Sequence, residues 1–268
     1  MSCAARFARF SKRAAIAALL AALAAGCGPR LDLGSDLLWT SLFEGNTFDE
    51  WTGDGDGAAL AFPEGGNNRV EISSERVRHG SYAAKLTVEA APGGEQGSAV
   101  LARAGEALPV EGYYSAWYWL PRSVSVSVNV GRYWVIFKFR QRNQDMVDEL
   151  FDLDLINLDA GEMSLQLYDH RRGASVPLDV DGPVVPVGQW FQIEAYYRNA
   201  QDDTGRLTFW LDGRQIVELA NQPMAPTPFV EWNACSIGAD LTPSTAVIYV
   251  DDCAVSRSRV GPNGIIAD

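Results

Sequence analysis

Segments in the middle and second half of this chain place charged, amide and aromatic side chains at every other position. Successive side chains of a β-strand point to opposite faces of a sheet. Each such segment would therefore offer one apolar face and one face of polar groups. The cations and possible proton acceptors among these groups are Lys138, Arg140, Tyr168, His170 and Tyr196. Removing a proton next to a carboxylate needs such a cation, together with a Tyr or His base within hydrogen-bond reach.

The same polar faces carry groups that could bind a sugar through its hydroxyls and its C–H face. These candidate ligand-binding residues are Trp117, Trp134, Asp152, Asp154, Gln166, Glu194 and Arg198. If the strands are neighbours, they form one broad water-facing surface that mixes Trp and Tyr with charges. An ordinary solvated face would be rich in Thr, Lys and Glu instead. We therefore expect a glycan to bind on this surface.

The strands that must position these residues are short and are separated by clusters of Gly, Pro, Asn and Asp. This spacing is typical of a sandwich or barrel. The predicted strands span 83–88, 112–120, 132–140, 150–157, 163–170, 190–198, 206–211, 234–238 and 246–256. The chain shows little helical periodicity beyond its N-terminal segment, no internal repeat and no low-complexity linker. We predict a single all-β domain.

The N-terminal segment has the organisation of a secretory signal. Basic residues precede an unbroken apolar run, 14–25, which ends at Gly26 and Cys27. This run is too short to span a membrane, which takes about 20 apolar residues. Residues 23–27 resemble the lipobox of bacterial lipoproteins, which implies that Cys27 receives a lipid.

We therefore expect a signal peptide at 1–26, a tether at 27–37 and the β domain at 38–268. Since no Asp follows Cys27, the lipobox resemblance implies the outer membrane or the cell surface. The alternative is an ordinary cleaved signal, which would leave the protein periplasmic or secreted.

The charge balance argues against nucleic acid as a partner. The chain has 22 basic and 34 acidic residues, a net charge of −12. A surface with this excess of negative charge repels nucleic acid. Beyond the lipid anchor, the partner we expect is a polysaccharide, and we expect the protein to be a monomer.

Two cysteines, Cys235 and Cys253, remain beyond the signal and the lipobox. They flank a turn-like stretch at 240–245, and a hairpin folded there would set them opposite one another. An exported chain favours a disulfide between them. The alternative is a pair of buried free thiols.

Three separate segments resemble family-4-like carbohydrate-binding modules: 42–46 (Leu-Phe-Glu-Gly-Asn), 79–86, which contains Gly-Ser-Tyr, and 248–255, which contains Tyr-Val-Asp-Asp. The resemblance implies a structural calcium ion. Its ligands would be Glu44, the carbonyl of Ser81, and Asp251 or Asp252. Calcium prefers six to eight oxygen ligands of these kinds. The alternative is that the two aspartates only end a strand.

The middle of the chain resembles concanavalin A-like lectins and heparin lyase I-like polysaccharide lyases. The matching segments are 112–121, 188–191 and 205–213. Both resemblances imply the same fold, two antiparallel sheets in a jelly-roll sandwich. Where the lyases carry a Gln-x-His strand, residues 137–140 read Phe-Lys-Phe-Arg.

Three functions stay open. The preferred one is a lipid-anchored, lectin-like protein that binds a polysaccharide, possibly one that contains uronates. The alternative is a polysaccharide lyase, with Lys138 or Arg140 as the neutralising cation and Tyr168, Tyr196 or His170 as the base. The third is a structural domain without a ligand. A glycoside hydrolase is disfavoured, although Asp152 and Asp154 would lie roughly 6.5–7 Å apart on one strand, within the range for paired carboxylates.

Overall fold

The structure is a computed structural model that describes residues 30–31, 34–52, 59–61, 67–104, 108–126, 133–143, 146–263 and 265–266. The chain divides into two units, Met1–Asp32 with Asn263–Asp268, and Leu33–Pro262. In the first unit, β1 (Arg30–Leu31) pairs in parallel with β19 (Ile265–Ile266). The predicted signal peptide and Cys27 lie outside the described residues, so lipidation stays a prediction.

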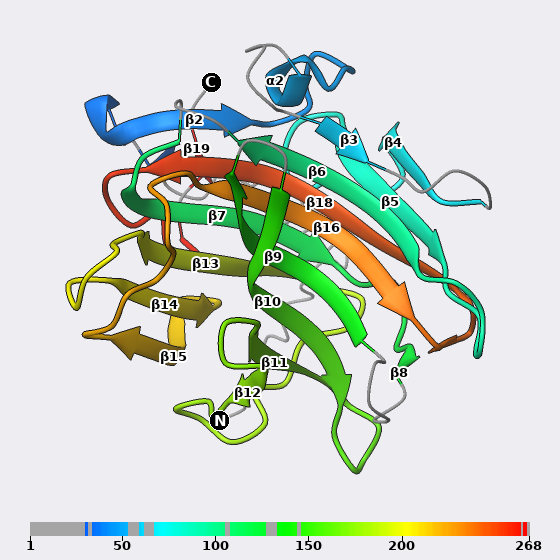
Figure 1. The fold of residues 1–268 in the computed structure, drawn as a ribbon. Coiled ribbons are helices and arrows are strands. Elements are labelled where there is room, and N and C mark those ends of the chain that lie inside the picture. The colour runs from blue at the N-terminus through cyan, green and yellow to red at the C-terminus, as the bar shows by residue number, and fades with distance from the viewer. Residues whose placement is uncertain are drawn as a thin grey trace, which may run out of the picture. The chain divides into compact units, whose positions relative to one another are not determined.

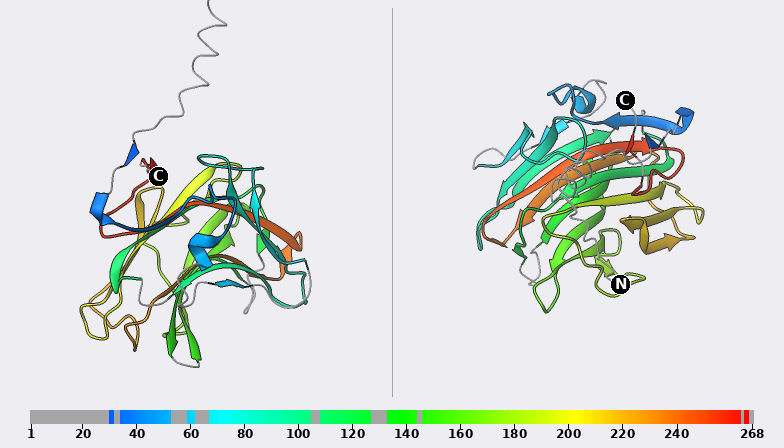
Figure 2. Two further views of the ribbon diagram at one scale, coloured as in Figure 1. Left: turned by 90° about the horizontal axis from the view of Figure 1, so that it is seen from above. Right: turned by 180° about the vertical axis from the view of Figure 1, so that it is seen from behind.

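The second unit is a sandwich of two antiparallel sheets (Figures 1 and 2). The seven-stranded sheet has the order β12-β11-β10-β9-β16-β6-β3, with bounds Ala174–Val176, Met163–Asp169, Met146–Asn157, Tyr133–Asn143, Glu231–Ala239, Gly97–Ala104 and Ala59–Ala61. The eight-stranded sheet has the order β15-β14-β13-β7-β18-β5-β4, with bounds Arg214–Ala220, Arg206–Leu211, Trp190–Arg198, Glu111–Trp119, Thr245–Ser256, Ala83–Glu89 and Arg69–Ser73. Its remaining strand, β2 (Leu37–Ser41), pairs with β18.

The remaining elements are short. Strand β8 (Ser125–Val126) pairs with β17 (Leu241–Thr242). The helices are a 3-10 turn, η1 (Gly34–Asp36), and α2 (Asp49–Thr52). No helix in the described part of the chain is long and apolar enough to cross a membrane. The all-β sandwich predicted from the sequence is therefore confirmed.

The two sheets are held together by large apolar side chains on their facing sides. Phe139 on β9 stacks on Tyr197 on β13 with ring centroids 4.4 Å apart, and Phe137 meets Phe209 on β14 edge-on at 5.3 Å. All four rings are fully buried. Burying a side chain of this kind contributes about 1.5–3 kcal/mol. This interior defines, for each sheet, an outer face that points away from it.

A β-bulge in β9 changes which of its side chains point outward. Leu153 lies opposite Phe137 and Asp154 lies opposite Val135, so Ile136 has no partner on β10. A bulge shifts the alternation of side chains by one residue. Trp134 is therefore fully buried in the core, where its indole N–H donates to the Ser236 hydroxyl at 2.9 Å. The prediction that Trp134 belongs to a glycan-binding face is wrong.

The two cysteines do not form the predicted disulfide. Cys235 lies on β16 of the seven-stranded sheet, whereas Cys253 lies on β18 of the eight-stranded sheet, and both are free and buried. The predicted hairpin does not exist, because the chain between the two cysteines passes from one sheet to the other. The alternative of two buried thiols is the one that the structure shows.

We expect both thiols to react only when the protein unfolds. Burial raises the pKa of the Cys235 and Cys253 thiols, which keeps them in the unreactive protonated form. The measurement is alkylation without reductant, before and after urea denaturation, followed by mass spectrometry of the two peptides. A peptide pair that stays linked and unlabelled in urea would contradict the structure.

Candidate active site

The structure divides the predicted site residues between the outer faces of the two sheets. The outer face of the seven-stranded sheet carries Lys138, Arg140, Asp152, Asp154, Gln166, Tyr168 and His170. The eight-stranded sheet carries Trp117, Glu194, Tyr196 and Arg198. The expected single surface is therefore wrong. Strands β9, β10 and β11 pair in sequence order, whereas β13 pairs with β7 and β14 in the other sheet.

A compact ion-pair network occupies the outer face of β9, β10 and β11. Asp152 lies opposite both Lys138 and Tyr168 in the strand register, and Arg140 lies opposite both Glu149 and Glu231. We call the group of Lys138, Arg140, Glu149, Asp152, Tyr168, His170 and Glu231 the Lys138 network. Its members come from four strands or their ends, so the sheet itself sets their positions.

Lys138 is the centre of this network. Its ammonium lies 2.7 Å from Glu149 Oε2 and 3.4 Å from Asp152 Oδ1, and the residue is only 6% exposed. Burial alone would lower the pKa of Lys138, but the charges of Asp152 and Glu149 outweigh it and raise this pKa. Arg140 extends the network, with guanidinium nitrogens 3.2 Å from Glu149 Oε1 and 3.2 Å from Glu231 Oε1.

His170 and Tyr168 form the more accessible side of the network. His170 Nε2 lies 2.8 Å from Asp152 Oδ2, and its side chain is 31% exposed. The hydrogen bond to Asp152 raises the pKa of His170, although burial opposes it. The rings of Tyr168 and His170 meet edge-on with centroids 4.9 Å apart. The half-buried phenol of Tyr168 thus lies beside the imidazole of His170, which favours its protonated form.

Ligand atoms of Glu149, Asp152 and His170 lie within 4.8 Å of one another, which is close enough for one ion to touch all three. The Lys138 ammonium already contacts both carboxylates of this group. We therefore describe the group as part of an ion-pair network and not as a metal centre. Beside it, Asp154 is 7% exposed, and no described residue forms a hydrogen bond with its Oδ1.

Chain segments cover the middle of the eight-stranded sheet's outer face. Glu194 is fully buried, and its carboxylate accepts hydrogen bonds from Arg259 Nε at 2.9 Å and from the Val260 amide at 2.7 Å. Trp117 is 8% exposed, because the Arg78 guanidinium lies 3.6 Å from its ring centroid. Other parts of the protein thus cover both Glu194 and Trp117, and their expected roles in sugar binding stay predictions.

Tyr196 and Arg198 remain accessible but lie on the wrong sheet for the expected chemistry. The Tyr196 hydroxyl donates to Glu111, and Arg198 Nε lies 3.8 Å from the same carboxylate. Burial, followed by the bond to Glu111, raises the pKa of Tyr196 to about 12. The sandwich interior separates Tyr196 from Lys138. Among the three predicted bases, only Tyr168 and His170 belong to the Lys138 network.

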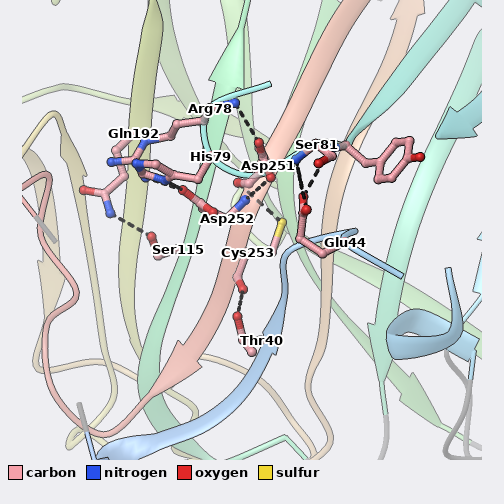
Figure 3. A network of polar contacts seen from close by, with 11 residues as sticks. Thr40, Glu44, Arg78, His79, Ser81, Ser115, Gln192, Asp251, Asp252 and Cys253 are labelled. Atoms are coloured by element: carbon pink, nitrogen blue, oxygen red, sulfur yellow. Dashed lines mark hydrogen bonds and ion pairs between the residues drawn. The ribbon is translucent and has the colours of Figure 1, made fainter. Parts of the chain in front are cut away.

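The acidic residues predicted to bind calcium lie near one another in the structure, and each of them has a hydrogen-bond or ion-pair partner (Figure 3). Both oxygens of Glu44 accept the Ser81 amide N–H at 2.9 Å. Asp251 accepts the amides of Arg78 and Asp252, each at 2.8 Å. Asp252 contacts the Arg78 guanidinium and lies 2.6 Å from His79 Nδ1.

The tight approach of Glu44 to its loop depends on Gly80. This glycine has φ +71°, and a Cβ atom on it would lie 2.2 Å from Glu44 Cδ. Backbone amides, an arginine and a histidine thus satisfy the carboxylates that a calcium ion would need. Calcium binding by these residues stays a prediction from the sequence.

Sequence reasoning missed Glu149 and Glu231. The predicted strands began at residues 150 and 234, one to three residues too late to include them, whereas β10 begins at Met146 and β16 at Glu231. A bulge between Glu149 and Phe151 also brings Glu149 to the face of Asp152, whereas strict alternation would place these two side chains on opposite faces. No local signal marks Glu231, because its partner Arg140 lies on a strand distant in sequence.

The fold and the site can be compared with known proteins. By fold, the chain is similar to an endo-β-1,4-glucuronan lyase from the fungus Trichoderma reesei, at a TM-score of 0.58 and 15% identity, over 79% of this chain and 96% of that one. It is also similar to the alginate lyase vAL-1 from a Chlorella virus, at a TM-score of 0.52 and 10% identity, over 83% and 100% of the two chains. A third similar structure is the cellulose induced protein Cip1, at a TM-score of 0.55 and 13% identity, over 83% and 98%.

Identities this low show a shared fold and nothing finer. No curated protein matches the chain significantly. The family model described as "Polysaccharide lyase" matches residues 43–227, which include every member of the Lys138 network except Glu231. Since that match spans well over half of the sequence, this chain belongs to the polysaccharide lyase family.

Proposed function

We propose that this protein cleaves a uronate-containing polysaccharide by β-elimination on the outer face of its seven-stranded sheet. In this reaction a base removes the proton next to the uronate carboxylate. The glycosidic oxygen then leaves with a proton from an acid, and a double bond remains in the product. The negative charge that develops on the carboxylate must be stabilised by cations or hydrogen-bond donors.

The observation that best supports this proposal is the Tyr168–His170–Asp152 group. Tyrosine can act as a base, and Tyr168 is partly exposed on the outer face of the seven-stranded sheet, which also carries Lys138 and Arg140. His170 is held by Asp152 in a form that favours its positive charge. We assign proton abstraction to Tyr168 and stabilisation of the developing charge to His170.

Lys138 has a different role in this proposal. It is buried and paired with two carboxylates, so its charge is already compensated within the protein. We assign it to positioning Asp152, and through Asp152 the imidazole of His170. Arg140 is more accessible, with 27% of its side chain exposed, and is the better candidate to contact an acidic sugar.

The experiment is incubation of the purified protein with a panel of polyuronates and of neutral glucans, with the unsaturated product followed by its ultraviolet absorbance. We expect product from at least one polyuronate and none from the neutral glucans. Retardation of the protein in a native gel that contains a polyuronate, without product from any of them, would instead favour the lectin. The absence of both product and retardation would argue against both functions.

The lipid anchor belongs to the same proposal. Lipidation of Cys27 would hold the enzyme at the outer membrane or the cell surface, where polysaccharides are encountered. What supports this part is the order of basic residues, apolar run and cysteine in the first 27 residues.

A further inference from the structure

Asp154 is a buried carboxyl group beside the Lys138 network that the network does not use. It lies on β10, opposite Val135 of β9 and Gln166 of β11. The residue is 7% exposed, and its Oδ1 has no hydrogen-bond partner within the described part of the chain. The Lys138 ammonium, which pairs with Glu149 and Asp152, forms no ion pair with it among the described residues. A buried polar atom in this state is costly unless water or a ligand completes its hydrogen bonding.

The surroundings of Asp154 favour its neutral form. On one side lies a small apolar cluster that includes Val135, Cys235 and Ile237, and on the other lies the carboxylate of Asp152. On the outer face of the strands around it, the titratable and charged side chains whose burial is described are Tyr133, Lys138, Arg140, Glu149, Asp152, Tyr168, His170, Glu231 and Cys235. Burial, followed by the charge of Asp152, raises the pKa of Asp154 to about 7, although Lys138 and His170 act in the opposite direction.

An ionised Asp154 would also oppose the proposed substrate. The Lys138 network already contains three carboxylates, those of Glu149, Asp152 and Glu231, and a fourth negative charge would repel a uronate. A neutral carboxylic acid has the opposite effect, because it can donate a hydrogen bond. Bonds from an O–H group to an anionic oxygen are short and strong, and enzymes keep carboxylic acids protonated for this purpose in apolar sites.

We propose that Asp154 is a substrate-binding residue whose neutral carboxyl group donates its O–H to the carboxylate of a bound uronate. This inference rests on the proposed function and deepens it, because it names the group that distinguishes an acidic sugar from a neutral one. Binding of the anion holds the proton on Asp154, so affinity and protonation are linked.

The test compares the wild-type protein with Asp154→Asn, which keeps a hydrogen-bond donor of similar shape and cannot ionise. The dissociation constant of a defined oligouronate is measured by calorimetry below and above neutral pH. We expect the wild-type affinity to fall by about tenfold per pH unit once Asp154 ionises, as one linked proton requires. Asp154→Asn should bind with a weaker dependence on pH than the wild type across the same range, because His170 is then the remaining titrating group.

Two further variants sharpen the comparison. Asp154→Ala removes the donor, and we expect about tenfold or greater loss of affinity below neutral pH, where the wild-type carboxyl group is neutral, in line with a lost charge-assisted hydrogen bond. Asp159→Asn makes the same chemical change on the exposed turn after β10 and should keep the wild-type pH dependence. The melting temperature of each variant checks that it has folded.

The outcomes separate this inference from the proposed function. If the wild type binds and cleaves a polyuronate while Asp154→Asn keeps the wild-type pH dependence, His170 is the titrating group and only the role of Asp154 is overturned. If the wild type neither binds nor cleaves any polyuronate, both proposals fail. A carboxyl NMR titration adds a readout without ligand, and an Asp154 that is ionised below neutral pH would overturn the inference directly.

Discussion

Replacing Tyr168 by phenylalanine is expected to lower kcat on a polyuronate by about 10²–10⁴-fold, the usual contribution of a positioned acid or base. The phenyl ring preserves the edge-on contact with His170, whose centroid lies 4.9 Å away. The fold and the surface that meets the substrate therefore stay the same, and KM should change little. The measurement is the initial rate of formation of unsaturated product at saturating and subsaturating substrate.

Tyr196→Phe provides a matched control for this prediction. Tyr196 is also a partly exposed tyrosine on a β-strand, but it lies on the outer face of the other sheet, where its hydroxyl donates to Glu111. We expect this variant to retain the wild-type kcat. Wild-type activity in Tyr168→Phe would remove Tyr168 as the base. Loss of activity in Tyr196→Phe alone would move the chemistry to the eight-stranded sheet.

Replacing Lys138 by methionine should destabilise the protein by about 3–5 kcal/mol, the range for breaking one side of a buried ion pair. The change keeps the length of the side chain and removes the only charge that contacts both Glu149 and Asp152 among the described residues. Asp152 is 6% exposed, so water cannot replace the lost cation well. The measurement is the free energy of unfolding from urea denaturation at neutral pH.

The stabilisation from Lys138 should persist across the neutral range. The folded-state pKa of Lys138 is raised above its ordinary value of 10.5. The contribution is therefore fully present below that value, and it is lost only as the pH rises through the folded-state pKa. Unfolding curves at neutral and strongly alkaline pH should show the difference between wild type and variant shrinking at the alkaline end.

Lys85→Met provides the control for this second prediction. Lys85 pairs with Glu75 at 2.9 Å, but the Glu75 side chain is 60% exposed. Exposed ion pairs of this kind contribute about 0–1 kcal/mol. A Lys138 variant no less stable than the Lys85 variant would show that the network around Asp152 does not depend on Lys138.

The local sequence was sufficient to predict the strands and the part of the site that lies on β9, β10 and β11. Each predicted strand is present in the structure, and 190–198 and 206–211 have the bounds of β13 and β14. Strand β6 was missed because its residues are buried on both faces, which replaces alternation by a nearly continuous apolar run. The sequence correctly places Lys138, Asp152 and Tyr168 on one face. Their strands follow one another along the chain and pair as antiparallel neighbours, so side chains that lie opposite one another point to the same face.

The alternation of residues thus determined, without any coordinates, an antiparallel sandwich and the outward direction of Lys138, Asp152, Tyr168 and His170. Only the tertiary structure decided that Tyr196 lies on the opposite sheet and that a bulge at Ile136 turns Trp134 inward. It also decided that Cys235 and Cys253 belong to different sheets. Alternation is a property of a few consecutive residues, whereas sheet membership and register arise from hydrogen bonds between strands distant in sequence. Asp154 shows the same division. Its residue type is visible in the sequence, but only the structure shows that the Lys138 ammonium pairs with Glu149 and Asp152 and that no described residue forms a hydrogen bond with Asp154 Oδ1.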